Sequence, residues 1–309
     1  MTALLVLTAA LATAAEPPEA MQRARQAYDL ARSGQFDAAI AELQEACRIA
    51  PANPLYRSAM GGILERQAKW ESAVAAFREA IRLDPANPKL LQKLESVSLE
   101  WGAILARERR FRAGLRHAQQ TAAQFPNSAS VHLMLGLFQT RNQQNVAAVT
   151  AYRRALSLDP DSADASVGLA IAQSSAGLAR DAEATLLGGL KKFPNDALHR
   201  QAYGVLLARM AESGSTPADR AIQMLESALA IDATLPEAHY QLGSLALANE
   251  DAAAALRHLE AAARNGLDDA RLHYAMARAL RRAGRAEDAA RHMEAFRQRK
   301  LAEELGVQP

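Results

Sequence analysis

The chain has 309 residues and a formal net charge of +2, and its acidic and basic residues are interspersed. A nucleic-acid-binding protein usually carries a clustered basic stripe, and this sequence has none, so no nucleic-acid partner is expected. Half of the residues are apolar and only 5% are aromatic, and the abundance of Ala and Leu favours helices. The single cysteine, Cys47, excludes an internal disulfide and a cysteine-based zinc site, and its place on an apolar helix face predicts a buried thiol.

The N-terminus differs in composition from the rest of the chain. Residues 3–15 form an uncharged apolar run, followed by Glu-Pro-Pro-Glu at 16–19. The run suits the hydrophobic region of a signal peptide and is shorter than the roughly 20 residues that span a bilayer. We expect a signal peptide over 1–15, cleaved after Ala14 or Ala15, a linker over 16–19, and a periplasmic or secreted protein without stable membrane insertion. No Lys or Arg precedes the run, so a short apolar helix of a cytoplasmic protein is the alternative.

Eight repeats follow, with predicted boundaries 20–53, 54–87, 88–128, 129–162, 163–196, 197–235, 236–269 and 270–303, and a tail over 304–309. The eighth position of every repeat is small: Ala27, Gly61, Gly102, Gly136, Ala170, Gly204, Gly243 and Ala277. The twentieth is small as well: Ala39, Ala73, Gly114, Ala148, Ala182, Ala221, Ala255 and Ala289. Because antiparallel helices approach closely only where facing residues lack bulk, these columns predict two touching helices in each repeat.

Other positions of the repeat support a helix–turn–helix pattern. Bulky side chains recur at the twenty-fourth position: Leu43, Phe77, Tyr152, Leu186, Leu225, Leu259 and Met293. Proline closes five repeats, because it cannot continue a helix: Pro51, Pro85, Pro126, Pro160 and Pro194. Gly34, Gly177 and Gly284 mark the turn between the helices, where a positive φ is needed.

The pattern resembles that of the tetratricopeptide repeat (TPR) family. The 34-residue period, the two small columns, the bulky position and the final Asp-Pro, as at Asp84-Pro85, all match, and the resemblance covers residues 20–303. It implies an all-α, right-handed α–α superhelix. It also implies a concave groove, lined by the first helix of each pair, that binds a protein or peptide.

Two repeats contain insertions. Seven extra residues in the third repeat keep apolar spacings of three and four from Leu90 to Ile104, so we expect a longer first helix. Five extra residues at 213–217 in the sixth predict a longer loop, with Thr216 as N-cap and Pro217 as the first helical residue.

The last repeat departs from the others at its end. Phe296, with Leu301 and Leu305, is expected to let the last helix cover the open end of the superhelix.

The sequence carries no signature of an enzyme. It has no phosphate-binding glycine loop, nucleophile elbow or His-Glu-x-x-His motif, and the repeats leave no room for a catalytic domain. We therefore expect no catalytic residues and no cofactor. Six of the seven histidines fall in two columns, the fourth (His132, His239, His273) and the twenty-third (His117, His258, His292). This register is expected to spread them along the repeats, so no metal site is predicted.

The thirteenth position is arginine in six repeats: Arg32, Arg66, Arg107, Arg141, Arg209 and Arg282. One interpretation is that a cation there stabilises the C-terminus of its own helix. The other is a ladder of guanidinium groups that binds carboxylates of an extended or acidic ligand, because arginine offers a planar fork of donors. The sequence leaves both open.

Apolar and aromatic residues accompany this column on the expected groove face. They are Tyr28, Leu55, Leu99, Leu133, Leu137, Tyr240 and Tyr274, and with the six arginines they make up the predicted partner-binding groove. In the second repeat we also expect Ser58 and Gly62 to face the ligand, whereas Trp70 and Phe77 pack between helices.

The sequence thus predicts a non-enzymatic scaffold that binds a protein or extended peptide in its groove, and the arginine column would suit an acidic partner. The alternative is a structural assembly factor of an envelope secretion or polysaccharide-export machine. The sequence does not indicate the oligomeric state.

Overall fold

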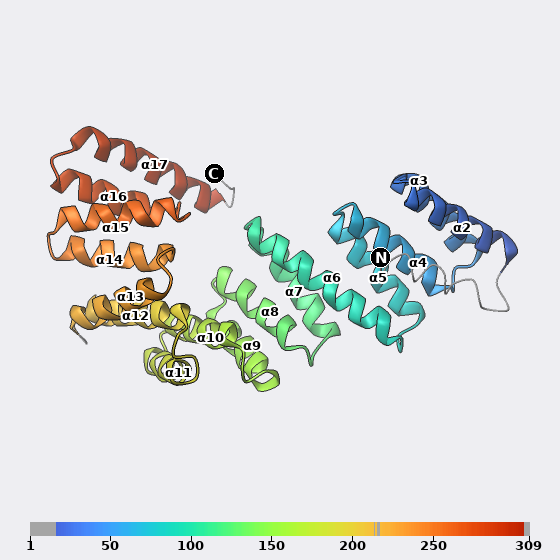
Figure 1. Ribbon diagram of the computed structural model, residues 1–309, viewed down its shortest axis with the longest axis horizontal. Helices are drawn as coiled ribbons and strands as arrows, with labels where there is room; N and C mark the ends of the chain where they lie inside the picture. Colours follow the sequence, from blue (N-terminus) through green and yellow to red (C-terminus); the bar gives the residue numbers. More distant parts are fainter. Residues whose placement is uncertain (1–16, 213, 215–216, 306–309) are drawn as a thin grey trace. The chain divides into compact units, whose positions relative to one another are not determined.

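The computed structural model describes residues 17–212, 214 and 217–305 (Figure 1). Within these ranges the chain forms sixteen helices and no strands, as predicted for an all-α protein. The predicted signal peptide, 1–15, lies outside the described residues. None of the described helices combines the length and the apolar character needed to cross a membrane.

The helices follow one another as antiparallel pairs along the chain (Figure 1). The pairs are α2 (Pro18–Arg32) and α3 (Phe36–Ile49), α4 (Pro54–Arg66) and α5 (Trp70–Leu83), α6 (Pro88–Arg107) and α7 (Phe111–Gln124), α8 (Ala129–Arg141) and α9 (Asn145–Leu158), α10 (Ala163–Ser175) and α11 (Ala179–Lys192), α12 (Ala197–Glu212) and α13 (Ala218–Ile231), α14 (Pro236–Ala248) and α15 (Ala252–Arg264), and α16 (Ala270–Arg282) and α17 (Ala286–Leu305).

The repeats divide into two compact units, and the boundary between Met134 and Leu135 lies within α8. In the second compact unit the first helices of successive repeats contact one another, α10 with α12, α12 with α14, and α14 with α16. These four helices therefore form a continuous layer, and the side chains that they do not bury form what we call the first-helix face.

The small columns lie where the paired helices touch, as predicted. A Cβ atom added to Gly61 would lie 2.9 Å from the Phe77 ring, and one added to Gly243 would lie 2.8 Å from Leu259. In the third repeat a different residue fills the space beside the small column, because its twenty-fourth position is the small Ala118. There the side chain of Met134 packs against Gly102. Cys47 is 8% exposed, which confirms the prediction of a buried thiol.

The turn within each pair requires one residue in the left-handed region. The predicted turn glycines Gly34, Gly177 and Gly284 have φ of +82°, +80° and +77°. Four other repeats place a residue with a side chain in this conformation: Ala68, Arg109, Gln143 and Glu250. Because a Cβ atom clashes with the backbone there, these four turns are strained by about 1–2 kcal/mol each.

The insertions lengthen helices as well as loops. The third repeat has the predicted long first helix, α6, with 20 residues. In the sixth repeat α12 extends to 16 residues, and α13 begins at Ala218. Pro217 is the N-cap and not the first helical residue, since its ψ of 137° is extended. The predicted N-cap, Thr216, lies outside the described residues.

The end of the last helix departs from the prediction. Phe296 packs its ring 5.3 Å from that of Tyr274. Leu301 is 55% exposed, so more than half of its surface faces solvent, and it contributes less to closing the open end than expected. It lies in the part of α17 that extends beyond α16, where no helix of the repeat remains to pack against it. The side chain of Leu305 lies outside the described residues.

Candidate protein-binding surface

The tyrosines that are not buried all lie on first helices. Three of the six tyrosines, Tyr56, Tyr152 and Tyr203, are at most 3% exposed and belong to the core. The other three, Tyr28, Tyr240 and Tyr274, lie on α2, α14 and α16, and Tyr274 is 45% exposed. Tyrosine presents a large rigid surface with one polar end, so these three are natural contacts for a partner.

The predicted groove residues are all accessible, but they do not converge on one pocket. In the first compact unit Tyr28, Leu55, Leu99 and Leu133 are partly exposed, and Arg32, Arg66 and Arg107 are exposed. In the second, Leu137 and Tyr240 are partly exposed, and Arg141, Arg209, Tyr274 and Arg282 are exposed. They are distributed along successive first helices, which suits an extended ligand better than a compact one.

Two residues of the second repeat contradict their prediction. Ser58 is only 5% exposed and Gly62 is also buried, so neither faces a ligand. Helix α4 packs against both α3 and α5, and it is therefore buried over a wide arc that includes this stripe.

Three arginines of the column make contacts to the preceding repeat. The Arg66 guanidinium lies 4.8 Å from the centre of the Phe36 ring. Arg209 Nη1 donates to Ser174 Oγ at 3.1 Å, and Arg282 Nη1 donates to the carbonyl of Leu247. Ser174 and Leu247 lie in the last turns of α10 and α14, where the helix dipole is negative. These two arginines thus stabilise the C-terminus of a neighbouring helix, a role that neither interpretation of the sequence included.

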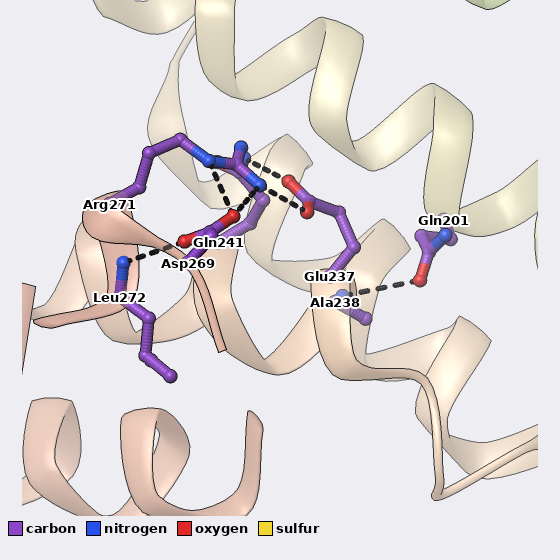
Figure 2. Close-up of polar contacts among 7 residues, drawn as sticks. All are labelled: Gln201, Glu237, Ala238, Gln241, Asp269, Arg271 and Leu272. Carbon is purple, nitrogen blue, oxygen red and sulfur yellow. Dashed lines mark hydrogen bonds and ion pairs between the residues drawn. The ribbon is translucent and has the colours of Figure 1, made fainter. Parts of the chain in front are cut away.

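A second set of polar contacts joins the first helices at their N-terminal ends (Figure 2). Arg271 Nη2 donates to Asp269 Oδ2 at 2.8 Å and to Glu237 Oε2 at 3.3 Å, which links α16 to α14. The same guanidinium lies 4.9 Å from the centre of the Tyr240 ring. Burial raises the pKa of Tyr240 despite this neighbouring cation, so the phenol stays neutral and keeps its hydrogen-bond donor.

The network continues to α12. Gln201 Oε1 accepts a hydrogen bond of 3.2 Å from the backbone N–H of Ala238, and Gln241 Nε2 donates to Glu237 Oε1 at 2.9 Å (Figure 2). Three successive first helices are therefore held together by side chains near their N-terminal ends. A partner that binds there meets an ordered surface, which reduces the conformational entropy lost on binding.

The first compact unit also contains a basic cavity of about 380 Å³ between α5, α6 and α7. Its lining includes Arg78, Arg110, Arg116, His117 and Trp101. Arg78 Nη1 donates to Gln120 Oε1 at 2.8 Å, and its Nη2 is buried without a hydrogen-bond acceptor among the described residues. Glu71 also lines the cavity and partly offsets the charge of the three arginines. Sequence reasoning missed it because its residues come from three helices and form no motif.

The histidines are not spread out as the sequence suggested. The fourth and twenty-third positions face each other within a repeat, and they bring His239 to His258 and His273 to His292. In the third repeat the fourth position is Ser98, and its carbonyl oxygen lies 2.7 Å from His117 Nε2. The facing small columns, at the eighth and twentieth positions, could have revealed this, since in antiparallel helices they set residues near the fourth position opposite those near the twenty-third.

The comparisons with known proteins agree with this architecture. The chain belongs to the tetratricopeptide repeat family, because one tetratricopeptide repeat model matches residues 24–88, 99–163 and 240–301, which is more than half of the chain. A second model of the same description matches residues 139–206. The scaffold formed by such repeats generally mediates protein interactions. The comparison with curated protein sequences gives no match.

Solved structures share the fold at low sequence identity. A tetratricopeptide repeat protein from Parabacteroides merdae is 18% identical, with a TM-score of 0.55 over 85% of this chain and 100% of that chain. A thermophilic TPR protein from Thermus thermophilus is 21% identical, with a TM-score of 0.52 over 60% of this chain and 98% of that one. Human IFIT1, solved as a dimer with m7Gppp-AAAA, is 16% identical, with a TM-score of 0.58 over 95% of this chain and 71% of that one. These similarities confirm the predicted fold class, an all-α repeat superhelix.

Proposed function

We propose that this chain is a non-enzymatic scaffold that binds an extended peptide segment of a partner protein along the first-helix face of its second compact unit. The observation that carries the proposal is the arrangement of Tyr240 and Tyr274 on successive first helices joined by the Arg271 network. Tyrosines on a preorganised surface are typical energetic centres of protein interfaces.

The charges on this face favour a partner with carboxylates. Arg209 and Arg282 are exposed, and so is Arg278, whose guanidinium lies 5.9 Å from the centre of the Tyr274 ring. A guanidinium has five N–H donors, so each arginine that contacts the preceding repeat keeps donors for a ligand. The contacts to Ser174 and Leu247 also fix the guanidinium groups in position. An acidic, extended segment with apolar side chains between its carboxylates would fit both sets of groups.

The proposal includes export to the periplasm or medium, on the basis of the apolar run and small residues at the N-terminus. N-terminal sequencing of protein from the periplasmic fraction tests it, and a mature start at residue 15 or 16 is expected. A scaffold that instead assembles an envelope secretion or polysaccharide-export machine would fractionate with that machine in the membrane. Intact residues 1–15 in a cytosolic protein would contradict export.

Site-specific photo-crosslinking in the native host tests the binding face. The crosslinking amino acid replaces Tyr240 or Tyr274 in one set of variants. It replaces Val146, which is 75% exposed on the second helix α9, in the control. We expect one protein to crosslink at both tyrosine positions and not at Val146, with mass spectrometry locating the same partner segment each time. Crosslinking only at Val146 would contradict the proposed face.

A further inference from the structure

The last two repeats each hold a pair of histidines whose Nδ1 atoms face each other. His239 of α14 and His258 of α15 have their Nδ1 atoms 3.2 Å apart, and His273 of α16 and His292 of α17 have theirs 3.0 Å apart. The ring centres lie 5.5 Å and 5.2 Å apart. All four side chains are partly exposed, so the pairs are open to solvent.

The ring orientation of the first-helix histidine is fixed in both pairs. His239 Nε2 lies 3.1 Å from the carbonyl oxygen of Ala233, and His273 Nε2 lies 2.9 Å from Asp268 Oδ1. A carbonyl or carboxylate oxygen only accepts, so Nε2 carries the hydrogen and the neutral ring has its lone pair on Nδ1. In each pair this lone pair points at the partner ring.

This arrangement is the one that metal-binding histidines use. A histidine ligand almost always donates its other N–H to a carboxylate or a backbone carbonyl, which sets the tautomer and the direction of the lone pair. The distances are also suitable. With metal–nitrogen bonds of about 2.0–2.1 Å, two nitrogens are roughly 2.9 Å apart in cis square-planar coordination and roughly 3.3 Å apart in tetrahedral coordination. The observed separations of 3.0 and 3.2 Å lie between these limits.

We propose that the pairs His239–His258 and His273–His292 are two chelating sites for a divalent transition metal ion that prefers imidazole ligands, with Cu²⁺ the strongest binder. The ion lies beside the line that joins the two Nδ1 atoms, at about 2.0–2.1 Å from each. It displaces the Nδ1 hydrogen of the second-helix histidine, which then carries its hydrogen on Nε2. Copper heads the affinity order for such nitrogen ligands. Each site joins the two helices of one repeat, so bound metal stabilises that repeat.

The surroundings of the two pairs determine what else can coordinate the ion. No group of three or more His, Cys, Asp or Glu residues able to hold a metal occurs among the described residues, so two nitrogens are the protein's ligands and water completes the coordination. The His273–His292 pair has a carboxylate behind it, from Asp268, whereas the His239–His258 pair has a neutral carbonyl. A carboxylate makes the imidazole a better donor, but Asp268 also pairs with Arg299, which offsets this effect, so the two sites should bind with similar affinity.

The test is a titration of the untagged full-length chain with CuSO₄, after dialysis against EDTA and then against metal-free buffer. Calorimetry should count two more ions per chain in the wild type than in the double variant His258→Gln/His292→Gln, and one more than in either single variant. His132→Gln is the matched control. Its Nε2 faces the carbonyl oxygen of Pro126 at 3.0 Å, but the twenty-third position of its repeat is Ala151. This variant should bind as many ions as the wild type.

A second measurement does not depend on variants. Electron paramagnetic resonance of the copper-loaded wild type should show two imidazole nitrogens per ion. Equal stoichiometry in the wild type and a folded double variant would overturn the proposal, as would a spectrum with one imidazole nitrogen or none.

Zn²⁺ provides a third readout, because it should raise the melting temperature of the wild type, reversibly with EDTA, and not that of the double variant.

Discussion

The ring of Tyr152 lies between two glycines, Gly136 of its own repeat and Gly168 of the next. A Cβ atom added to Gly136 would lie 2.8 Å from the ring, and one added to Gly168 would lie 2.5 Å from it. The ring is 3% exposed. The backbones of the two glycines lie directly against it, so neither position has room for a side chain. The contact with Gly136 pairs the eighth and twenty-fourth positions of one repeat, and the contact with Gly168 packs that repeat against the next.

Gly136→Ala should therefore destabilise the protein by about 1–3 kcal/mol through overpacking. Urea unfolding followed by circular dichroism measures the change. Gly188→Ala is the control, because Gly188 also lies inside a helix but has no atom within 4 Å of an added Cβ. That control should stabilise the protein by about 0.5–1 kcal/mol, since alanine favours a helix more than glycine does. Equal effects of the two substitutions would contradict the close approach.

Ala68→Gly should stabilise the second repeat by about 0.5–1 kcal/mol, because Ala68 has a φ of +56° and glycine adopts this conformation without a clash. The matched substitution in the opposite direction is Gly34→Ala, at a φ of +82° in the corresponding turn of the first repeat. It should destabilise the protein by about 1 kcal/mol. Melting temperatures of the two variants measure both effects, and shifts in the same direction would refute the assignment of these turns.

Arg282→Gln should loosen the last repeat, because it removes the donor to the Leu247 carbonyl and the cation 3.9 Å from Glu250. The side chain is 39% exposed, so solvent screening limits the expected loss to about 1 kcal/mol. Hydrogen exchange over α16 and α17 measures it. Arg281→Gln, in the same last turn of α16, controls for the effect of charge on the helix's own dipole. If both variants exchange equally fast, the contact to the preceding repeat contributes nothing.

His117 should make the stability of the first compact unit depend on pH. Burial lowers the pKa of this imidazole, and the nearby Arg78 also lowers it, against the opposing effects of the Ser98 carbonyl and Glu71. The folded state therefore binds its proton less readily than the unfolded state does. The stability that this gives is complete above the unfolded pKa of about 6.5 and is lost as the pH falls below it.

The free energy of unfolding, measured in urea at pH 7.5 and pH 5, tests this dependence. His117→Gln should show a smaller difference between the two pH values than the wild type, because the same change in pH no longer charges a buried group. An unchanged difference would mean that His117 is not desolvated.

The sequence predicted the contacts that follow from local spacing. Gly61 and Phe77 lie at the eighth and twenty-fourth positions of one repeat, and their separation fixes their contact once two helices pair. The packing of Met134 against Gly102 could not be predicted, because the small Ala118 does not indicate which side chain fills the space.

The candidate site was predicted less completely, for the same reason. Spacing placed Tyr240 and Tyr274 on first helices, but it did not reveal that Arg271 joins α16 to α14. Contacts between residues of different repeats depend on how the repeats stack, and the spacing of residues along the sequence does not reveal the stacking. The cavity around Arg78 was missed for the same reason, because α5 belongs to the second repeat and α6 and α7 to the third. The histidine pairs lie within single repeats, and the register of the small columns could have revealed them.

Binding of a partner segment to the first-helix face can be measured directly once crosslinking has located that segment. The measurement is the affinity of the segment, made as a synthetic peptide, for the wild type, for Tyr240→Ala/Tyr274→Ala and for the control Val146→Ala. We predict that the double variant raises Kd at least tenfold, since loss of a central tyrosine costs about 2 kcal/mol, and that the control leaves Kd unchanged. A double variant that binds the peptide as tightly as the wild type would contradict binding at this face.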